Sequence, residues 1–398
     1  MRAARLLLVC GLGFLAACGG AASPARTSPV AASGSRSPSS PAPAPVSQLF
    51  APAAAWFVTS DRGWAVGTVP CHSGVTTLCV TMVGTSDGGG HWTSLTPPPF
   101  LDLADPYHHA VFRMTTGGDG LLSDGRPGAP LWSTHDGGST WDRLVLPGAA
   151  ADAEIGDIAL DGASAYVVVG DRAGQQVFTG PVHGSALHVT GPALTGTDGA
   201  VDLTAVGGRA WVLSSPGLPG QVPRLWRTSD GSAWTATPVP CVAGATGRIA
   251  AIDSAHVVLG CQDEPRGPDA EKAFFTSPDG GLTFAPGAHL APDGYLQSIA
   301  APSTTVVIAA VSSDNDLLVR SGNATSSFVV SFASQVDGNG QGLYDLVFPD
   351  STHGFVVLGD SGAYAVAVAS GVEGVPPPRL LTTGDAGGHW TQLSIGRP

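Results

Sequence analysis

The 398-residue chain has almost no lysine and little glutamate: Lys272 is its single lysine, and it contains four glutamates. Long helices usually carry both residue types on their exposed faces, so this shortage argues against a helical fold. The chain is instead rich in glycine (55) and proline (33), which separate short runs of valine, threonine and aromatic residues. Runs of this kind between turn-forming residues are typical of strands. The composition therefore predicts an all-β protein.

Positive charge is also scarce, and the formal net charge is −13. Contacts to phosphates require clustered lysine and arginine, so we exclude nucleic acid as a partner. The acidic balance favours solubility but does not identify a ligand.

Long hydrophobic runs are lacking apart from residues 6–15, which are too few for a stable membrane span. This run follows Arg2 and Arg5 and leads into Leu15-Ala16-Ala17-Cys18-Gly19. The segment resembles a bacterial lipoprotein signal peptide over residues 1–17. The resemblance implies that Cys18 receives a fatty acid on its sulfur and anchors an exported protein at the outer face of the cytoplasmic membrane. An ordinary cleaved signal peptide is the alternative.

Residues 18–48 consist mainly of serine, proline and alanine. They contain too little bulky apolar surface to form a core, so we expect a disordered tether between the lipid and a folded domain at 49–398.

Cysteine usage fits an exported protein. Cys10 leaves with the signal peptide and Cys18 carries the lipid, which leaves an even number of cysteines for disulfides. We expect near neighbours to pair, each pair across one hairpin: Cys71 with Cys79, and Cys241 with Cys261. A zinc site is disfavoured because the Cys-x-x-Cys spacing is missing.

An internal repeat decides the fold. Five segments share an aspartate, one or more glycines and a closing aromatic residue: Ser86–Trp92, His135–Trp141, Ser229–Trp234, Pro278–Phe284 and Gly384–Trp390. We call these segments the box turns. Their aspartates and aromatic residues are Asp87 and Trp92, Asp136 and Trp141, Asp230 and Trp234, Asp279 and Phe284, and Asp385 and Trp390.

The box turns resemble the Asp-box, or BNR, repeat of sialidases and related β-propellers. The role expected for each aspartate is structural, because its short side chain can accept hydrogen bonds from backbone N–H groups of its own turn. The glycines permit the positive φ angles of such a turn, and the aromatic residue packs into the blade.

A second pattern precedes the box turns, in which an apolar strand, a polar turn and an apolar strand follow one another. It begins seven times, at Trp56, Val111, Asp157, Asp202, Arg248, Ser298 and Asp345. The units that begin at Asp157 and Ser298 lack a recognisable box turn. Units of about fifty residues accommodate four short strands. The sequence therefore predicts a seven-bladed β-propeller of four-stranded antiparallel blades, with six blades as the alternative.

Alignment of the seven units places Asp157, Asp202, Arg248, Ser298 and Asp345 at one repeat position. Innermost strands of a propeller line its central channel. We expect the three carboxylates to face the channel mouth with Arg248 between them and to hold a cation or polar ligand. The alternative is that each carboxylate caps its own strand or bonds the backbone of a neighbouring blade.

Two further segments offer metal-ligating side chains, although we expect no cofactor and no metal. Asp337–Gly342 resembles the start of a calcium loop, but its twelfth position is Phe348 instead of the bidentate glutamate. His108 and His109, with Asp105 nearby, are adjacent in sequence, and neighbouring residues of a strand point to opposite faces.

The sialidase resemblance implies an arginine triad, a tyrosine nucleophile with a glutamate, and an aspartate acid. The nearest match to the first arginine motif is Phe112-Arg113-Met114-Thr115, which lacks the expected Ile-Pro. The chain is also similar to photosystem II assembly factor-like propellers, which are non-enzymatic protein-binding scaffolds. We therefore expect a membrane-tethered, extracytoplasmic, non-catalytic propeller that binds protein or cell-envelope glycan, with a sialidase-like glycoside hydrolase as the alternative.

Overall fold

A computed structural model describes residues 50–396 apart from 72–76, 173, 195–199, 216–219, 264–269, 291–293, 313–315, 322–326 and 335–341. The signal peptide, Cys18 and the tether lie outside the described residues, and so does the segment that resembles a calcium loop except for its last residue, Gly342. Within the described ranges, no helix is long and apolar enough to cross a membrane.

Seven four-stranded antiparallel sheets make up the described part, and in each sheet the strands lie in chain order. Blade 1 consists of β1 (Ala51–Phe57), β2 (Gly63–Pro70), β3 (Leu78–Thr85) and β4 (Thr93–Leu95). Blade 2 consists of β5 (Val111–Met114), β6 (Gly120–Ser123), β7 (Leu131–Thr134) and β8 (Asp142–Leu144). Blade 3 consists of β9 (Glu154–Asp161), β10 (Ser164–Asp171), β11 (Gly174–Pro181) and β12 (His188–Leu194).

Blades 4 and 5 consist of β13 (Ala200–Val206), β14 (Arg209–Ser215), β15 (Arg224–Thr228) and β16 (Thr235–Pro238), followed by β17 (Thr246–Ala251), β18 (Val257–Gln262), β19 (Lys272–Ser277) and β20 (Ala285–Leu290). Blades 6 and 7 consist of β21 (Tyr295–Ser303), β22 (Val306–Ser312), β23 (Asp316–Ser321) and β24 (Val329–Ala333), followed by β25 (Leu343–Val347), β26 (Gly354–Leu358), α1 (Ser361–Ser370), β27 (Arg379–Thr383) and β28 (Thr391–Leu393).

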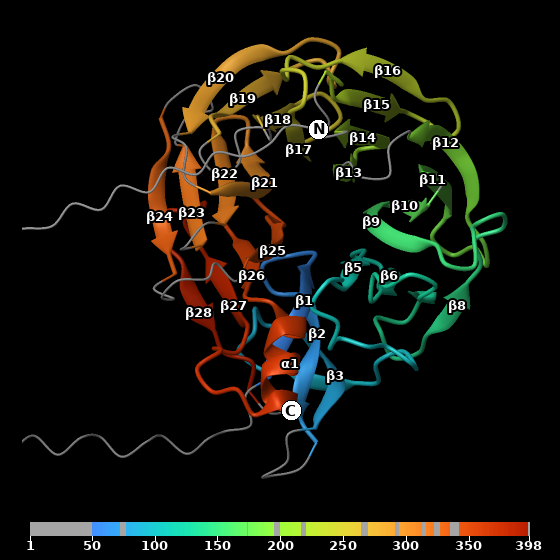
Figure 1. Ribbon diagram of the computed structural model, residues 1–398, viewed down its shortest axis with the longest axis vertical. Coiled ribbons are helices and arrows are strands. Elements are labelled where there is room, and N and C mark those ends of the chain that lie inside the picture. Colours follow the sequence, from blue (N-terminus) through green and yellow to red (C-terminus); the bar gives the residue numbers. More distant parts are fainter. Residues whose placement is uncertain are drawn as a thin grey trace, which may run out of the picture. The chain divides into compact units, whose positions relative to one another are not determined.

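The first strand of each blade contacts the first strand of the next, and β25 contacts β1. The blades therefore form a closed ring around a central channel (Figure 1). The prediction of seven blades is confirmed, and the alternative of six is wrong. Each blade is built from consecutive strands, so the ring closes without exchange of a strand between its ends.

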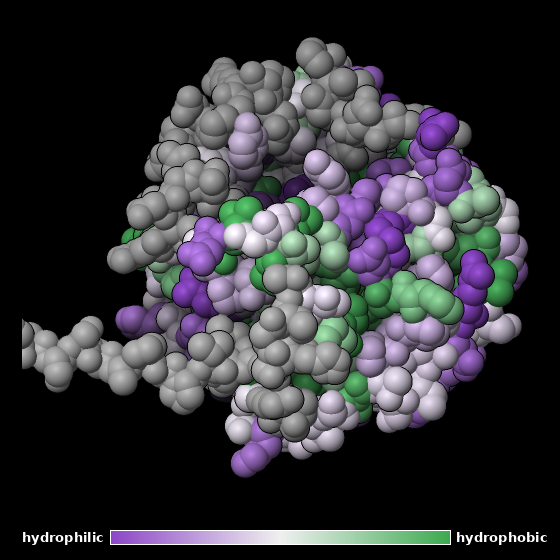
Figure 2. All heavy atoms as spheres, turned by 60° about the horizontal axis from the view of Figure 1, so that its bottom comes forward, coloured by the Kyte–Doolittle hydropathy of each residue, from purple (hydrophilic) through white to green (hydrophobic). Residues whose placement is uncertain are grey.

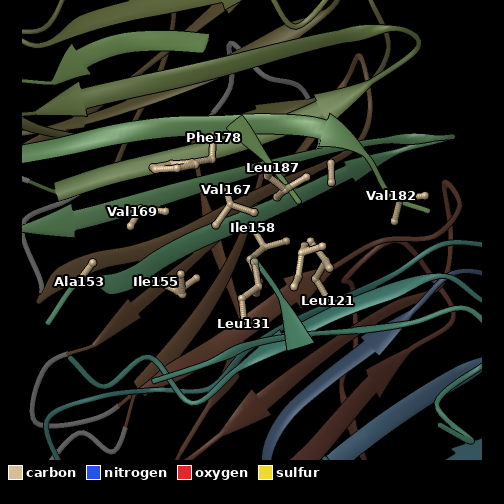
Figure 3. Packing of buried hydrophobic residues seen from close by; sticks show 12 residues of the cluster. Leu121, Leu131, Ala153, Ile155, Ile158, Val167, Val169, Phe178, Val182 and Leu187 are labelled. Atoms are coloured by element: carbon tan, nitrogen blue, oxygen red, sulfur yellow. The ribbon is translucent and has the colours of Figure 1, made fainter. Parts of the chain in front are cut away.

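Seven hydrophobic clusters hold the ring together, one between each pair of neighbouring blades. Figure 3 shows the cluster between blades 2 and 3, where Leu121 and Leu131 face Ile155, Ile158 and Val167. The closing interface joins blade 7 to blade 1, and there the rings of Phe57 and Phe355 stack with centroids 3.5 Å apart.

The second strands explain the apolar runs of the sequence. Every residue of β18 and β26 is buried, and so are all residues of β22 except the last. Such a strand is covered by a neighbouring blade on both faces, so it reads as a continuous hydrophobic run without polar alternation. The short outer strands β4 and β28 are largely exposed.

The box turns connect the third and fourth strands of blades 1, 2, 4, 5 and 7. In blade 2 the Thr134 hydroxyl donates to Asp136 at 2.9 Å and accepts from Gly138 N, also at 2.9 Å. Asp136 Oδ1 accepts from the backbone N–H groups of Ser139 and Thr140. The Thr140 hydroxyl and backbone N–H lower the pKa of Asp136 to about 2. The carboxylate is thereby occupied within its own turn.

The box turns also connect neighbouring blades. In four box turns, the backbone carbonyl of the residue after the aspartate accepts a hydrogen bond from a side chain of the preceding blade. These carbonyls and their donors are Gly137 and Trp64, Gly231 and Thr179, Gly280 and Trp211, and Ala386 and Arg320. The box aromatic residues lie in the same interfaces. The expectation that they pack within one blade was incomplete, because they pack between blades.

Ala386 has a φ of 57°, where the other box turns have glycine. An L-residue in this left-handed conformation costs about 1–2 kcal/mol, part of which a more flexible unfolded chain offsets. We therefore expect Ala386→Gly to raise the free energy of unfolding by up to about 1 kcal/mol in urea titrations. The reverse change, Gly137→Ala at φ 76°, should lower it by a similar amount. Equal stability of all three proteins would contradict this.

Both predicted disulfides are present: Cys71 with Cys79 and Cys241 with Cys261. The first bridges the hairpin of β2 and β3. The second does not cross a hairpin, contrary to our expectation. Cys241 lies in the connection from blade 4 to blade 5, and the disulfide ties this connection to β18. The bond therefore lies in the interface between the two blades.

Candidate functional site

The central channel contains two cavities, of about 310 and 420 Å³. The smaller lies where the inner strands begin and the larger where they end. Five residues line both cavities: Arg113, Asp157, Asp202, Ser298 and Asp345. We call these five residues the polar waist. The three predicted carboxylates thus come together, but inside the channel and not at its mouth.

Arg113 occupies the place expected for Arg248. Its Nη1 lies 2.9 Å from Asp345 Oδ1 and its Nη2 lies 3.5 Å from Asp157 Oδ1. The guanidinium carbon lies 4.3 Å from the centre of the Trp56 ring, a cation–π contact. Arg248 donates to the Gln297 carbonyl at 2.6 Å instead and acts electrostatically on Asp202.

Each waist carboxylate also bonds the next blade. Asp345 accepts from Ala55 N at 3.1 Å. Asp157 accepts from Leu203 N at 2.9 Å, and Asp202 accepts from Ile249 N at 2.6 Å. This is the backbone-bonding role that we named as the alternative to ligand binding. Ligand binding at the waist stays a prediction.

Burial dominates the electrostatics of the waist. It raises the pKa of Asp157 to about 7, against the lowering effect of Arg113 and with a further rise from Asp202. Burial also raises the pKa of Asp202 and of Asp345. Burial therefore favours the protonated form of the waist carboxyls. Fully ionised, the three waist carboxylates together with Arg113 and the neighbouring Arg248 carry one net negative charge, and they carry none when one carboxyl is protonated.

The two cavities differ in their walls. The smaller is lined by His109, Tyr344, Arg248 and Gln297, and the rings of His109 and Tyr344 lie 4.3 Å apart. The larger is lined mostly by apolar residues, including Trp56, Leu160, Val206, Ile252 and Phe348. A ligand in the channel would thus meet a polar half and an apolar half.

The two ends of the ring carry different connections. The four strands of each blade are antiparallel and follow chain order. The connection from the second strand to the third, and the connection from the fourth strand to the first strand of the next blade, therefore both lie on the side where the inner strands begin. We call this side the loop face. The box turns and the turns between first and second strands lie on the opposite side, the turn face. The loop face carries the long segment 96–110 and α1 (Figure 1).

Segment 96–110 is anchored at several points. Leu103 is buried, and Asp102 N donates to Asp124 at 3.0 Å. Arg126 pairs with Asp102 at 2.8 Å and with Asp124 at 3.0 Å. A side chain at Gly362 of α1 would collide with the backbone carbonyl of Asp105, so the helix lies directly on the segment.

This anchored segment presents two aromatic side chains to solvent: Phe100 is 87% exposed and Tyr107 is 85% exposed. Phe100 also has a φ of 63°. His108 and His109 lie in the same segment and not on a strand, and they have different partners. His108 Nδ1 lies 3.2 Å from Asp105 Oδ2, and the His109 ring packs against the Tyr344 ring with the two planes tilted by 33°.

The sequence identifies Arg113 only as the nearest match to the first sialidase arginine, whereas the structure places it as the central cation of the waist. A signal for this role was available. Arg113 stands two residues after Val111, which begins its unit as Asp157 begins another, and alternate residues of a strand face the same side. The sialidase set is not assembled: among the described residues, the two cavities are lined by two arginines and no glutamate.

No protein-family model and no curated protein matches the sequence. Several solved structures, in contrast, are similar to the structure of this chain. YCF48 from Cyanidioschyzon merolae aligns over 80% of this chain and 95% of its own, with 17% identity and a TM-score of 0.50. A structure titled U3-55K aligns over 78% of this chain and 89% of its own, with 15% identity and a TM-score of 0.50.

A puromycin-hydrolysing peptidase of Mycobacterium tuberculosis gives a TM-score of 0.57 at 13% identity. The alignment covers 87% of this chain but 53% of the peptidase, so this chain corresponds to about half of that enzyme. At these identities the likenesses show a shared β-propeller fold.

Proposed function

We propose that the protein is a non-catalytic binding propeller, exported and tethered to the membrane through a lipid on Cys18, which holds a protein partner on its loop face. The observation that carries this proposal is the pair of exposed aromatic side chains, Phe100 and Tyr107, on the anchored segment 96–110. Cell-envelope glycan is the second class of partner.

Aromatic residues are enriched among the contacts that dominate binding energy. A segment already fixed by Leu103 and by the Arg126 ion pairs loses little conformational freedom when a partner binds. The left-handed backbone of Phe100 fits the same role, since strain of about 1–3 kcal/mol tends to persist at functional sites.

The face seen in Figure 2 mixes hydrophilic and hydrophobic residues, with the hydrophobic ones in several small groups. The proposal rests on two single aromatic anchors, Phe100 and Tyr107, and not on a broad apolar patch. One fold neighbour, YCF48, has been solved bound to D1 peptide, at 18% identity and a TM-score of 0.50. This precedent favours a protein over a glycan.

Hydrolysis is the second candidate function. The raised pKa of Asp157 favours it, because carboxyls with strongly perturbed pKa values cluster at active sites. Against it, Arg113 is engaged by Asp345 and Asp157, and each waist carboxylate already accepts a backbone N–H of the next blade.

Site-specific photo-crosslinking in cells tests the binding proposal. A photoreactive residue in place of Phe100 or Tyr107 should give discrete protease-sensitive adducts. The matched control is Leu282, which is 50% exposed in a box turn on the turn face and should give none. Adducts from Leu282 alone, or none from either aromatic position, would overturn the proposal. Adducts sensitive to a cell-wall hydrolase and not to a protease would replace the protein partner by glycan.

Turnover of a fluorogenic sialoside and a panel of other glycosides by the purified protein tests the hydrolase. We expect none. Turnover that disappears in Asp157→Asn would instead make the waist an active site.

A further inference from the structure

Three potential metal ligands meet between blades 2 and 3, and none of them belongs to the channel. Asp119 lies in the turn between β5 and β6, His135 in the box turn of blade 2, and His183 in the connection of β11 to β12. One ligand atom from each residue lies within 4.8 Å of the others. The two histidines come from separate blades and converge on one carboxylate.

The distances in this cluster are close to those between the ligands of a bound metal ion. The Nδ1 atoms of His135 and His183 lie 3.0 and 3.2 Å from Asp119 Oδ1. In a tetrahedral site with metal–ligand bonds of about 2.0–2.1 Å, neighbouring ligand atoms are roughly 3.3 Å apart. Small movements of exposed side chains would therefore admit an ion. The ion pairs described for Asp119 are both with these histidines.

The connection that carries His183 is held in place independently of the cluster. Val145 of blade 2 donates its N–H to the Ser185 carbonyl at 3.1 Å and accepts from Leu187 N at 3.0 Å. These bonds fix residues 182–187 against blade 2. The ligands are thus preorganised by the fold, which reduces the entropic cost of binding.

Exposure also suits an ion site. The Asp119 side chain is 10% exposed, whereas those of His135 and His183 are 36% and 64% exposed. The carboxylate charge is largely removed from water, and the imidazoles leave a solvent path to it. Three protein ligands leave a fourth position for water.

We propose that Asp119, His135 and His183 bind one divalent transition-metal ion of the Zn²⁺ class, which clamps blade 2 to blade 3. The position supports this function. Blade 3 has no box turn, so the carbonyl contact that box turns make to the preceding blade is missing at this interface. The metal bridge joins the two blades in its place. Imidazole with carboxylate suits Zn²⁺ and similar ions, whereas Ca²⁺ and Mg²⁺ prefer oxygen ligands alone.

Calorimetric titration of the purified, chelator-treated protein with Zn²⁺ tests the site. We expect one saturable ion per chain and no binding of Mg²⁺. The decisive variant is His183→Ala, because this side chain is 64% exposed and its removal takes little packing from the fold. This change should weaken Zn²⁺ binding by about 100-fold or more, since even indirect support of a ligand is worth 10–100-fold. The Zn²⁺-induced rise in melting temperature should disappear with it.

The matched control is His91→Ala. His91 Nδ1 lies 2.6 Å from Asp87 Oδ2, and the described residues add no third metal ligand to this histidine–carboxylate pair. This variant should bind Zn²⁺ as the unaltered protein does. Zn²⁺ affinity that survives His183→Ala, or no saturable binding at micromolar Zn²⁺, would overturn the proposal.

Discussion

Replacement of Arg113 by methionine is expected to destabilise the folded protein by about 3–5 kcal/mol at pH 8, because removal of one partner leaves the other charges of the waist buried and unpaired. The Arg113 side chain is 17% exposed, and its partners Asp157 and Asp345 are 14% and 8% exposed. Methionine retains apolar contact with Trp56, so the change removes charge more than packing.

The loss should depend on pH. The pKa of Asp157 in the folded protein is about 7, above its ordinary value of 3.8. A carboxyl with a raised folded-state pKa binds its proton more tightly when folded. Its contribution is therefore most favourable below pH 4 and is lost as the pH rises towards 7. Without Arg113 the waist pKa values rise further, so the gap between variant and unaltered protein widens from pH 5 to pH 8.

Urea unfolding at pH 5 and pH 8 measures this gap. Asp157→Asn in the same chain should recover part of the loss at pH 8 and little at pH 5, because the carboxyl is already protonated there. Arg172→Met is the control, since this guanidinium is 96% exposed and pairs with Asp152 at 3.9 Å. An equal loss at both pH values would show that Arg113 acts through packing and not through charge.

The fold was predictable because this propeller repeats the same four-stranded blade, and with it the same local sequence pattern, seven times. Each unit shows the same apolar strand, polar turn and apolar strand, and five units end in a box turn. The pattern is weak in the unit that begins at Val111, but the six other units establish the repeat and so identify this one as well. The carboxylates Asp157, Asp202 and Asp345 were found for the same reason, since they share a repeat position.

Arg113 as the central cation of the waist, and His183 as a metal ligand, escaped prediction because neither is marked by the repeat. Arg113 pairs with Asp345 across 232 residues of sequence, from the closing blade of the ring. His183 lies in a connection without a box turn, and it meets Asp119 only because blades 2 and 3 are neighbours in space. Contacts between different blades follow from the closure of the ring, and no local pattern records them.

Among substitutions that shorten one buried apolar side chain, we expect the largest loss of stability at Trp211. This side chain is completely buried in the interface of blades 4 and 5, and its Nε1 donates to the Gly280 carbonyl at 2.9 Å. Truncation of a buried tryptophan typically costs about 3–5 kcal/mol, so Trp211→Ala should lower the free energy of unfolding by that amount. Urea titration with tryptophan fluorescence or circular dichroism measures it.

Trp211→Phe separates the hydrogen bond from the packing. Phenylalanine fills most of the volume but leaves the Gly280 carbonyl without its donor, and an unsatisfied buried acceptor costs about 1–3 kcal/mol. Trp92→Phe is the matched control. Trp92 lies in the interface of blades 7 and 1, where its buried Nε1 finds no hydrogen-bond partner in the described part of the chain. Loss of that N–H should cost nothing, so Trp211→Phe should be the more damaging of the two. If both changes cost the same, apolar packing alone holds the blades together, and the carbonyl contacts of the box turns add no stability to the ring.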